Sequence, residues 1–451
     1  MKLGIWCDFG ATLEPTQGIG VFVTNLVDAL ARQPSIESML LVAKAGEEEK
    51  LAPMIPAGAN IRVAGNPKPP LIIRKAWKSL RKIERKHLYE LFDNKAPDQY
   101  DRTKRWWASP IVRYLDSLVL RRKRAWLDSV DLWLLPYVGL DHPFTKPTVV
   151  ILHDLVTYHF PESIRPDKLA AFQRLVRQVT HRATRVACMS QFILENDLWN
   201  TLTLPKDRTD MIRPAIPKDF STPHKPPSTA ERITSNTSPS TAVPQAPSPK
   251  LPAGVKRRRY LLYPAGFRTY KNHAILVDCL TKLSQEPSDV LRDLHVVFTG
   301  ISNCPPELSK RITSLGVSER VHVLGKVSRA ELESLYRNAY ATVVPSLYEQ
   351  GSFPLMEALQ FECPVLASDI PPLREQLHGL GESALYFDPR SDNSLIQALR
   401  TLDSDWEKRL RNQLDGFRVL QSRSWDDVAI QWCDVFRRTL SESRITENQA
   451  P

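Results

Sequence analysis

Residues 341–359 read ATVVPSLYEQGSFPLMEAL, and this stretch decides the fold. Its apolar start, Ala341 to Pro345, predicts a buried strand, and a short polar turn then leads to Pro354. Proline suits the first turn of a helix because the N–H group that it lacks would have no partner there. We therefore expect a strand, a turn and a helix, which is the connection typical of parallel α/β sheets.

Two glutamates flank the turn, Glu349 and Glu357, with seven residues between them. The amides of Gly351, Ser352 and Phe353 are expected at the helix N-terminus, where the backbone dipole favours an anion such as phosphate. Helical side chains lean toward the N-terminus, so Glu357 can point back at the turn. Carboxylates beside an anion pocket suit a nucleotide sugar, which carries phosphate and hydroxyl groups. The alternative is that both glutamates are solvated residues of a loop and a helix start.

The rest of the chain repeats the alternation of strand and helix. Short apolar runs separated by helical stretches such as 275–283 and 330–338 are typical of βαβ units and parallel sheets. The candidate strands are Leu3 to Trp6, Met39 to Val42, Leu132 to Leu135, Thr148 to Leu152, Val186 to Met189, Tyr260 to Tyr263, His295 to Thr299, Val321 to Leu324, Ala341 to Val344 and Pro364 to Ala367. The fold class is therefore α/β.

The length of 451 residues predicts two domains, because one core of ordinary size does not use so long a chain. A segment rich in Pro, Ser and Thr lies between the halves and cannot bury enough apolar surface to offset its ordering, so we expect it to be disordered. We place the domains at residues 1–216 and 257–420, the linker at 217–256, and a final helix and tail at 421–451.

Positive charge is concentrated in the first half. Residues 68–124 hold 17 Lys and Arg against 6 Asp and Glu. The difference, +11, equals the net charge of the whole chain. Apolar residues 73, 76, 77, 80 and 83 share one helical face there, so we expect a basic helical insert at about 68–126. Such a helix docks on an anionic membrane surface or packs its apolar face on the core. Nucleic-acid binding is a third option, but no recognised nucleic-acid motif accompanies the charge.

The cysteines and the N-terminus indicate the compartment. Six cysteines are scattered without metal-ligand spacing, which favours reduced thiols and predicts no structural metal. Asp8 comes too early for a secretory signal, and no apolar run approaches the roughly 18–20 residues that span a bilayer. We expect a cytoplasmic protein, peripheral at the inner membrane if the insert docks there.

The stretch around the two glutamates resembles the Glu-x7-Glu signature of retaining glycosyltransferases of family 4. The resemblance implies the GT-B fold, in which two Rossmann-like doubly wound domains face across a cleft and the last helix crosses back to the first domain. It also implies that Glu349 contacts the donor sugar and Glu357 the nucleotide ribose. The sequence has Gln350-Gly351-Ser352 where the family usually has Gly-Phe-Gly, and its small residues still allow close backbone approach to phosphate.

A second segment, YLLYPAGFRTYKNH (260–273), ends a strand in a loop that carries Arg268 and Lys271. Ligands of open α/β sheets bind beyond the carboxyl ends of the strands, and cations there neutralise a diphosphate leaving group. The segment resembles the family's Lys-Asn segment, which implies that Lys271 holds the diphosphate. The family's arginine often lies where this chain has Gly266, and we expect Arg268 to substitute for it. Either cation is otherwise an ordinary exposed residue.

Three segments of the first half complete the resemblance. His153 follows an apolar strand in a segment similar to the His-Asp-Leu…Pro-Glu segment of mannosyl-type members, which implies contact with the donor sugar; a structural histidine is the alternative. Ser190 ends another strand and is expected to cap the next helix. Gly18 and Gly20 form a Gly-x-Gly loop that the family places beside the donor phosphate, and otherwise a tight turn.

We therefore expect a retaining glycosyltransferase that moves a sugar, mannose-like by resemblance, from a nucleotide-diphosphate donor to the hydroxyl of a glycan or lipid-linked acceptor in cell-surface polysaccharide or glycolipid synthesis. No cofactor or metal is expected, since no Asp-x-Asp motif ends a strand. The alternatives are a GT-B epimerase or phosphorylase, and a degenerate nucleotide-sugar-binding or membrane-scaffold protein.

Overall fold

The computed structural model describes residues 1–9, 11–14, 18–66, 127–138, 146–217, 255–300 and 303–448. The basic insert expected at about 68–126 and nearly all of the linker expected at 217–256 lie outside these residues. The predictions for membrane docking and for the linker therefore stay predictions.

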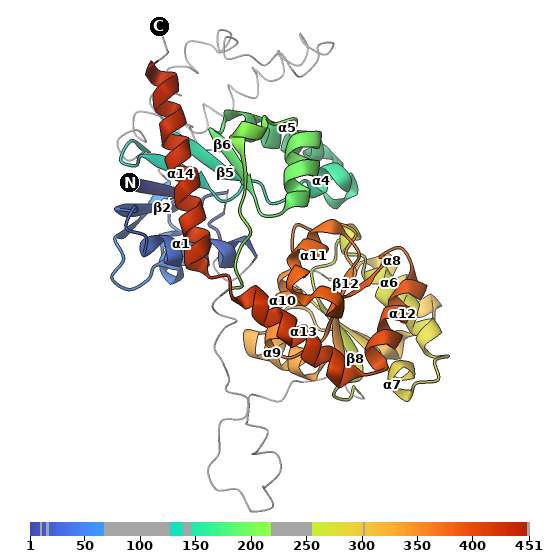
Figure 1. Cartoon of the computed structure of the whole chain (residues 1–451). Helices are drawn as coiled ribbons and strands as arrows, with labels where there is room; N and C mark the ends of the chain where they lie inside the picture. The colour runs from blue at the N-terminus through green and yellow to red at the C-terminus, as the bar shows by residue number, and fades with distance from the viewer. Residues whose placement is uncertain are drawn as a thin grey trace, which may run out of the picture. The chain divides into compact units, whose positions relative to one another are not determined.

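The N-terminal half builds a seven-stranded sheet in the order β3-β2-β1-β4-β5-β6-β7 (Figure 1). Its described pairs are parallel, as expected for βαβ units. The strands are β1 (Lys2–Trp6), β2 (Ser38–Lys44), β3 (Ile61–Asn66), β4 (Leu132–Leu135), β5 (Thr148–Ile151), β6 (Arg185–Cys188) and β7 (Thr209–Met211).

The C-terminal half builds a six-stranded parallel sheet in the order β10-β9-β8-β11-β12-β13. Its strands are β8 (Tyr260–Pro264), β9 (His295–Thr299), β10 (Val321–Val323), β11 (Ala341–Val344), β12 (Val365–Ser368) and β13 (Leu385–Phe387). The order changes direction between β8 and β11, so the chain segments that follow these two strands emerge side by side, where ligands of open α/β sheets bind.

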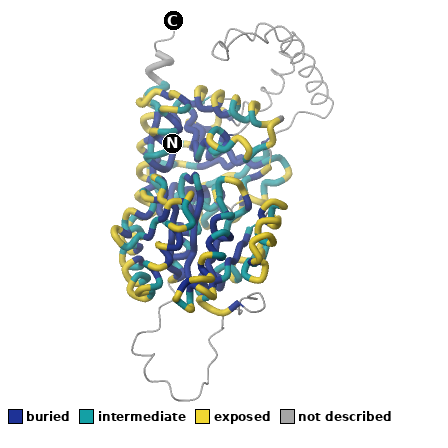
Figure 2. The backbone as a smooth tube through the Cα atoms, turned by 90° about the vertical axis from the view of Figure 1, so that its right-hand side faces the viewer, coloured by how far each residue is buried: buried dark blue, intermediate teal, exposed yellow. Residues whose placement is uncertain are grey.

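Helices connect the strands and cover the sheets. The second sheet has α6, α8 and α12 on one side and α9, α10 and α13 on the other (Figure 1). The α-helices are α1 (Ile19–Ala31), α4 (Val156–His159), α5 (Pro166–Arg182), α6 (His273–Leu283), α7 (Asp289–Arg292), α8 (Pro306–Ser314), α9 (Arg329–Asn338), α10 (Phe353–Gln360), α11 (Pro371–Gln376), α12 (Asp392–Asp403), α13 (Trp406–Gln421) and α14 (Trp425–Asn448), and a π-helix spans Ile193–Thr201. Figure 2 shows buried strand segments inside and exposed helical turns outside.

The described strands agree closely with the sequence predictions. Leu132–Leu135, His295–Thr299 and Ala341–Val344 have the predicted bounds, and the other seven predicted strands differ by one or two residues at one or both ends. β3, β7 and β13 were not predicted. All three are edge strands, and an edge strand needs no continuous apolar run because it is covered on fewer sides.

The chain forms two compact units. The smaller comprises Met1–Val150, Arg182–Thr184 and Phe436–Pro451, and the larger comprises Ile151–His181 and Arg185–Val435. Among the described residues, no helix combines the length and the apolar character that crossing a membrane requires.

Candidate active site

The turn after β11 has the predicted local structure. β11 is fully buried, and α10 begins at Phe353 with Pro354 in its first turn, as the missing N–H group of proline favours. Ser352 occupies the N-cap position in an extended conformation. The amides of Gly351 to Phe353 therefore lie at a helix N-terminus, as expected.

Lys271 and Glu349 are brought together by the neighbouring strands β8 and β11. Lys271 Nζ donates a hydrogen bond to Glu349 Oε1, and Ser346 Oγ donates to the same oxygen at 2.8 Å. The hydroxyl of Tyr263, at 3.0 Å from Ser346 Oγ, extends this buried chain into the core. Burial lowers the pKa of Lys271, but the carboxylate of Glu349 more than compensates, so the pKa lies above its usual value and the ammonium stays charged.

The loop that carries Lys271 is fixed by Asn272. This residue adopts the left-handed conformation (φ 54°), which asparagine tolerates better than most residues. Its side-chain amide donates to Pro345 O at 3.1 Å and to Pro389 O at 2.7 Å, which ties the loop to the end of β11. Arg268 is exposed, and its guanidinium donates to the carbonyl of Phe267 at 3.4 Å. Arg268 is thus near Lys271 in the chain but makes no bond to Glu349.

Glu357 contacts α9. Tyr336 Oη donates to Glu357 Oε2 at 2.6 Å, and Arg329 Nη1 lies 3.6 Å from Oε1. Burial raises the pKa of Glu357, while the bond from Tyr336 and the charge of Arg329 partly offset the increase. The side chain therefore presents its carboxylate between α10 and α9.

One of the three turn amides is already bonded. Ser352 N donates to Gln376 Oε1 at 2.7 Å, and Gln376 Nε2 donates to Ser352 O at 2.9 Å. This paired bond holds α11 against the turn. A phosphate that used the Ser352 amide would have to displace Gln376.

His153 follows β5 and is buried. Gln350 Nε2 lies 3.0 Å from His153 Nδ1. With the amide of Gln350 in this orientation its nitrogen donates, so Nδ1 accepts and a neutral His153 carries its proton on Nε2. Gln350 of the turn thus contacts the histidine that the sequence predicts beside the donor.

A second link between these segments was not predicted from the sequence. The Tyr348 hydroxyl accepts from Leu155 N at 3.0 Å and donates to Asp197, which is fully buried. His159 Nε2 also lies 2.9 Å from Asp197 Oδ1. A buried aspartate needs such partners because burial disfavours its charged form. The sequence feature that hints at this link is the position of Tyr348, which directly precedes Glu349.

The remaining predicted residues lie as follows. Ser190 Oγ accepts from Ile193 N at 3.2 Å, so its predicted capping role is confirmed. Gly18 is exposed at φ 36° before α1, a conformation that favours glycine, and Gly20 is buried within α1. Both glycines belong to the smaller unit, and all the other predicted site residues belong to the larger one.

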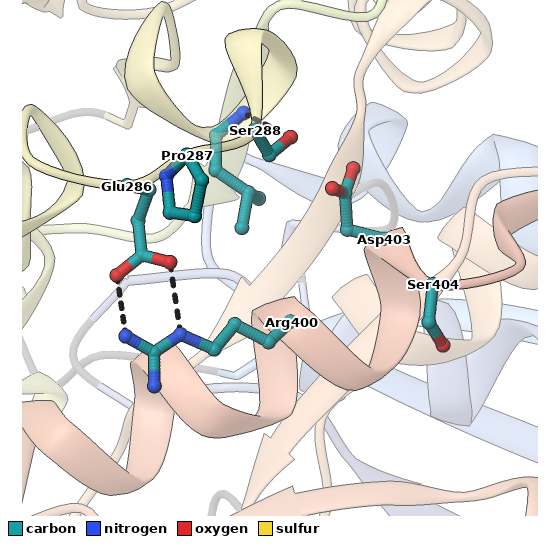
Figure 3. A pocket seen from close by; sticks show the side chains of 7 residues that line it. Glu286, Pro287, Ser288, Arg400, Asp403 and Ser404 are labelled. Atoms are coloured by element: carbon teal, nitrogen blue, oxygen red, sulfur yellow. Dashed lines mark hydrogen bonds and ion pairs between the residues drawn. The ribbon is translucent and has the colours of Figure 1, made fainter.

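A separate hollow of about 290 Å³ lies between α7 and α12 and is lined by Glu286, Ser288, Arg400 and Asp403, among others (Figure 3). Arg400 forms a forked ion pair with Glu286, with distances of 2.8 and 2.6 Å. The charge of Arg400 is therefore already neutralised by Glu286. None of the predicted site residues lines this hollow. Among the described residues, no group of three or more His, Cys, Asp or Glu has the arrangement of a metal site.

Comparison with known families gives a match over residues 250–414 to the model described as "Glycosyl transferases group 1". The MMP alpha-(1->4)-mannosyltransferase of Mycolicibacterium hassiacum is 34% identical over 150 residues, which cover 33% of this chain and 36% of that protein. O-antigen chain mannosyltransferase B of Escherichia coli is 21% identical over 337 residues, covering 73% and 80% of the two chains. D-inositol 3-phosphate glycosyltransferase of Corynebacterium glutamicum is a further relative. The match covers less than half of its length, as it does for the Mycolicibacterium protein.

Solved structures resemble the whole chain. Sucrose-phosphate synthase of Thermosynechococcus elongatus has a TM-score of 0.61 at 15% identity and covers 98% of this chain and 99% of its own. HepE of Anabaena, solved with UDP and glucose, has a TM-score of 0.57 at 16% identity and covers 97% and 100%. At such identities the likeness establishes the fold alone. The predicted fold class is confirmed, because the chain has two Rossmann-like parallel-sheet domains and its structural neighbours are GT-B proteins. The family match and the named relatives support a glycosyltransferase.

Proposed function

We propose that this protein is a glycosyltransferase that moves a sugar from a nucleotide-diphosphate donor to an acceptor hydroxyl. The observation that carries the proposal is the ion pair of half-buried Lys271 and buried Glu349, which lie in the loops that follow β8 and β11, and Glu349 precedes the N-terminus of α10. The family match at 250–414 includes both residues. The cation of Lys271 and the N-terminus of α10 can together bind a diphosphate. The adjacent carboxylate of Glu349 can accept hydrogen bonds from sugar hydroxyls.

Each residue then has a defined part in the reaction. When the donor binds, Lys271 leaves Glu349 and pairs with the donor diphosphate. There it stabilises the negative charge that develops on the diphosphate as the sugar is transferred. Glu349, released from that bond, accepts hydrogen bonds from the donor sugar. Arg268 is the second cation, and its exposed guanidinium donates only a long hydrogen bond, of 3.4 Å, to the carbonyl of Phe267. Neither glutamate serves as a general base, since both act as acceptors for donor hydroxyls.

Glu357 and His153 bind the two ends of the donor. Glu357 accepts from the ribose, and Tyr336 fixes its carboxylate. His153 is assigned to the donor sugar by the resemblance of its segment, and Gln350 Nε2 lies 3.0 Å from its Nδ1. The amides of Gly351 and Phe353 contribute to phosphate binding without displacement of Gln376, which is bonded to the amide between them.

The finer assignment rests on resemblance. Retention of the anomeric configuration and membership of family 4 follow from the Glu-x7-Glu signature, and a mannose-like donor is favoured by the segment at His153. The Mycolicibacterium and Escherichia relatives are both named as mannosyltransferases, which supports that donor. We propose a glycan or lipid-linked acceptor, a role in cell-surface polysaccharide or glycolipid synthesis, no resident cofactor or metal, and peripheral attachment to the inner membrane through residues 68–126.

The test is release of nucleoside diphosphate from UDP- and GDP-sugars in the presence of a glycan or lipid-linked acceptor pool. Turnover by the wild type that is lost in Lys271→Ala and kept in Lys282→Ala supports the proposal, because Lys282 is paired with Asp392 on the surface. Binding without turnover across the donor panel would favour a degenerate nucleotide-sugar-binding protein. Interconversion of the donor without an acceptor would favour an epimerase, and phosphate-dependent cleavage of the glycan a phosphorylase.

A further inference from the structure

A second pocket, of about 620 Å³, lies beside the turn after β11. It shares residues 350–353 with the candidate active site, but Lys271, Glu349, Glu357 and His153 do not line it. The end of β6, the chain after β7, α11, the end of α13 and Gln431 of α14 form its walls. All of these residues belong to the larger unit.

Two arginines, Arg213 and Arg423, line this pocket. The Arg423 guanidinium donates to the Arg213 carbonyl at 2.9 and 3.2 Å and to Gln431 Oε1 at 2.7 Å. Burial lowers the pKa of Arg423; the charge of Asp427 partly offsets this effect, and the charge of Arg213 adds to it. The hydrogen bonds of Arg423 are made to neutral oxygens, the carbonyl of Arg213 and the amide of Gln431.

The carboxylate in the pocket wall, Glu375, is committed elsewhere. Its two oxygens accept from Gln191 N at 2.7 Å and Phe192 N at 2.9 Å, at the start of the helical segment after β6. Arg213 Nη2 lies 3.7 Å from Glu375 Oε2, which is beyond hydrogen-bond distance. Arg213 Nε is buried and has no hydrogen-bond partner among the described residues. The pocket therefore has more positive charge than its single carboxylate can satisfy.

The rest of the wall is largely apolar. Met189, Met211, Ile216, Met356 and Leu420 are among its lining residues. A planar guanidinium binds the two oxygens of a phosphate or carboxylate in a forked arrangement, and it does so more strongly where water is partly excluded. The pocket thus combines an anion-binding group with an apolar surface.

We propose that this pocket binds a phosphate or carboxylate group carried by an apolar molecule, with Arg213 as the principal cation and Arg423 beside it. The pocket borders the turn amides assigned to the donor diphosphate, and its two arginines lie outside that assignment. The proposal does not depend on sugar transfer, since Arg213 and Arg423 are not among the residues assigned to the reaction.

The test is equilibrium dialysis of the full chain against radiolabelled inorganic phosphate at low ionic strength. We expect Arg213→Gln to weaken one phosphate site at least tenfold and Arg213→Lys, which keeps the charge, to weaken it less. Arg400→Gln is the matched control, because Arg400 lines the other hollow but is neutralised by Glu286. Thermal unfolding of each variant verifies that the fold is kept.

The outcomes separate this proposal from the proposed function. Phosphate binding that Arg213→Gln leaves unchanged would overturn the pocket assignment, including the case in which Lys271→Ala alone removes the binding. Loss of one phosphate site in Arg213→Gln, together with absence of sugar transfer by the wild type, would support the pocket and count against the glycosyltransferase.

Discussion

The ammonium of Lys271 and the carboxylate of Glu349 form an ion pair with side chains that are only 21% and 8% exposed. In the absence of a ligand each group satisfies the other, so neither charge is left unpaired in a dry environment. A donor diphosphate would bind Lys271 and release Glu349 toward the sugar hydroxyls. One contact thus holds the two groups on which the proposed reaction most depends.

Removal of one partner of this pair is expected to destabilise the fold. Lys271→Met leaves Glu349 buried without its cation, and we expect a loss of roughly 3 kcal/mol in the free energy of unfolding. The double variant Lys271→Met/Glu349→Gln should lose less than the sum of the single variants, since it removes both charges. Urea denaturation measures the cycle. Lys282→Met, at a surface pair, should cost less than about 1 kcal/mol, and additive single effects would contradict the pairing.

Gln350 is expected to act through the tautomer of His153. Gln350→Ala removes one hydrogen bond, worth about 1 kcal/mol, so kcat/KM should fall roughly fivefold. Gln350→Glu should reduce it further, because a carboxylate accepts from Nδ1–H and favours the wrong tautomer. Nitrogen NMR shifts of the His153 ring report this change directly. Gln421→Ala is the surface control, and unchanged His153 shifts in both Gln350 variants would refute the assigned role.

Donor affinity is expected to depend on pH through Glu357. Burial raises its pKa, so its carboxylate takes up a proton at a higher pH than an ordinary glutamate, near 4.3, as the solution is acidified. A protonated Glu357 is a poorer hydrogen-bond acceptor for the ribose. The affinity for the donor should therefore fall over the pH range in which Glu357 takes up its proton. Tyr336→Phe removes a bond that lowers the pKa, so the fall should begin at higher pH, and Glu357→Gln should abolish it.

The control for this pH dependence is another tyrosine–carboxylate pair. Tyr340 Oη donates to Asp403 at 2.8 Å, outside the candidate active site. Tyr340→Phe should leave the pH profile of donor affinity unchanged when dissociation constants are measured between about pH 5 and 8. An identical shift in Tyr340→Phe and Tyr336→Phe would remove Glu357 as the cause.

Acid should destabilise the protein through His273, the first residue of α6. Burial among aromatic rings lowers the pKa of His273 to about 4, from 6.5 in the unfolded chain. The unfolded state therefore binds the proton more readily, and stability that is complete above pH 6.5 is lost as the pH falls toward 4, by about 3 kcal/mol in all. His273→Gln should flatten this slope in pH-dependent denaturation, whereas the exposed His378→Gln should not. If the slope persisted in His273→Gln, other titrating groups would be responsible for the loss of stability in acid.

The sequence predicted the backbone of the site because strand ends are local features. Lys271, Glu349 and His153 each follow a strand of apolar residues, and the carboxyl ends of parallel strands lie at one edge of a sheet. The start of α10 was likewise predictable from Pro354. These inferences required no knowledge of which side chains touch.

The hydrogen bonds that orient these residues could not be predicted. Gln350 and His153 are 197 residues apart, and Tyr348 and Asp197 are 151 apart, so their contacts depend on how distant segments pack. Gln376 bonds to the Ser352 amide for the same reason. Edge strands such as β13 also escaped prediction, since partial covering leaves a weaker apolar pattern.

The most direct test of the account is calorimetric titration of the wild type and variants with GDP-mannose and UDP-glucose. We expect at least one of these donors to bind the wild type with a dissociation constant below about 1 mM, the upper range of KM values common among enzymes. Lys271→Ala and Glu357→Gln should weaken that binding at least tenfold, and Arg400→Gln should leave it unchanged. Equal binding by all four proteins, or no binding of either donor by the wild type, would contradict the proposed donor site.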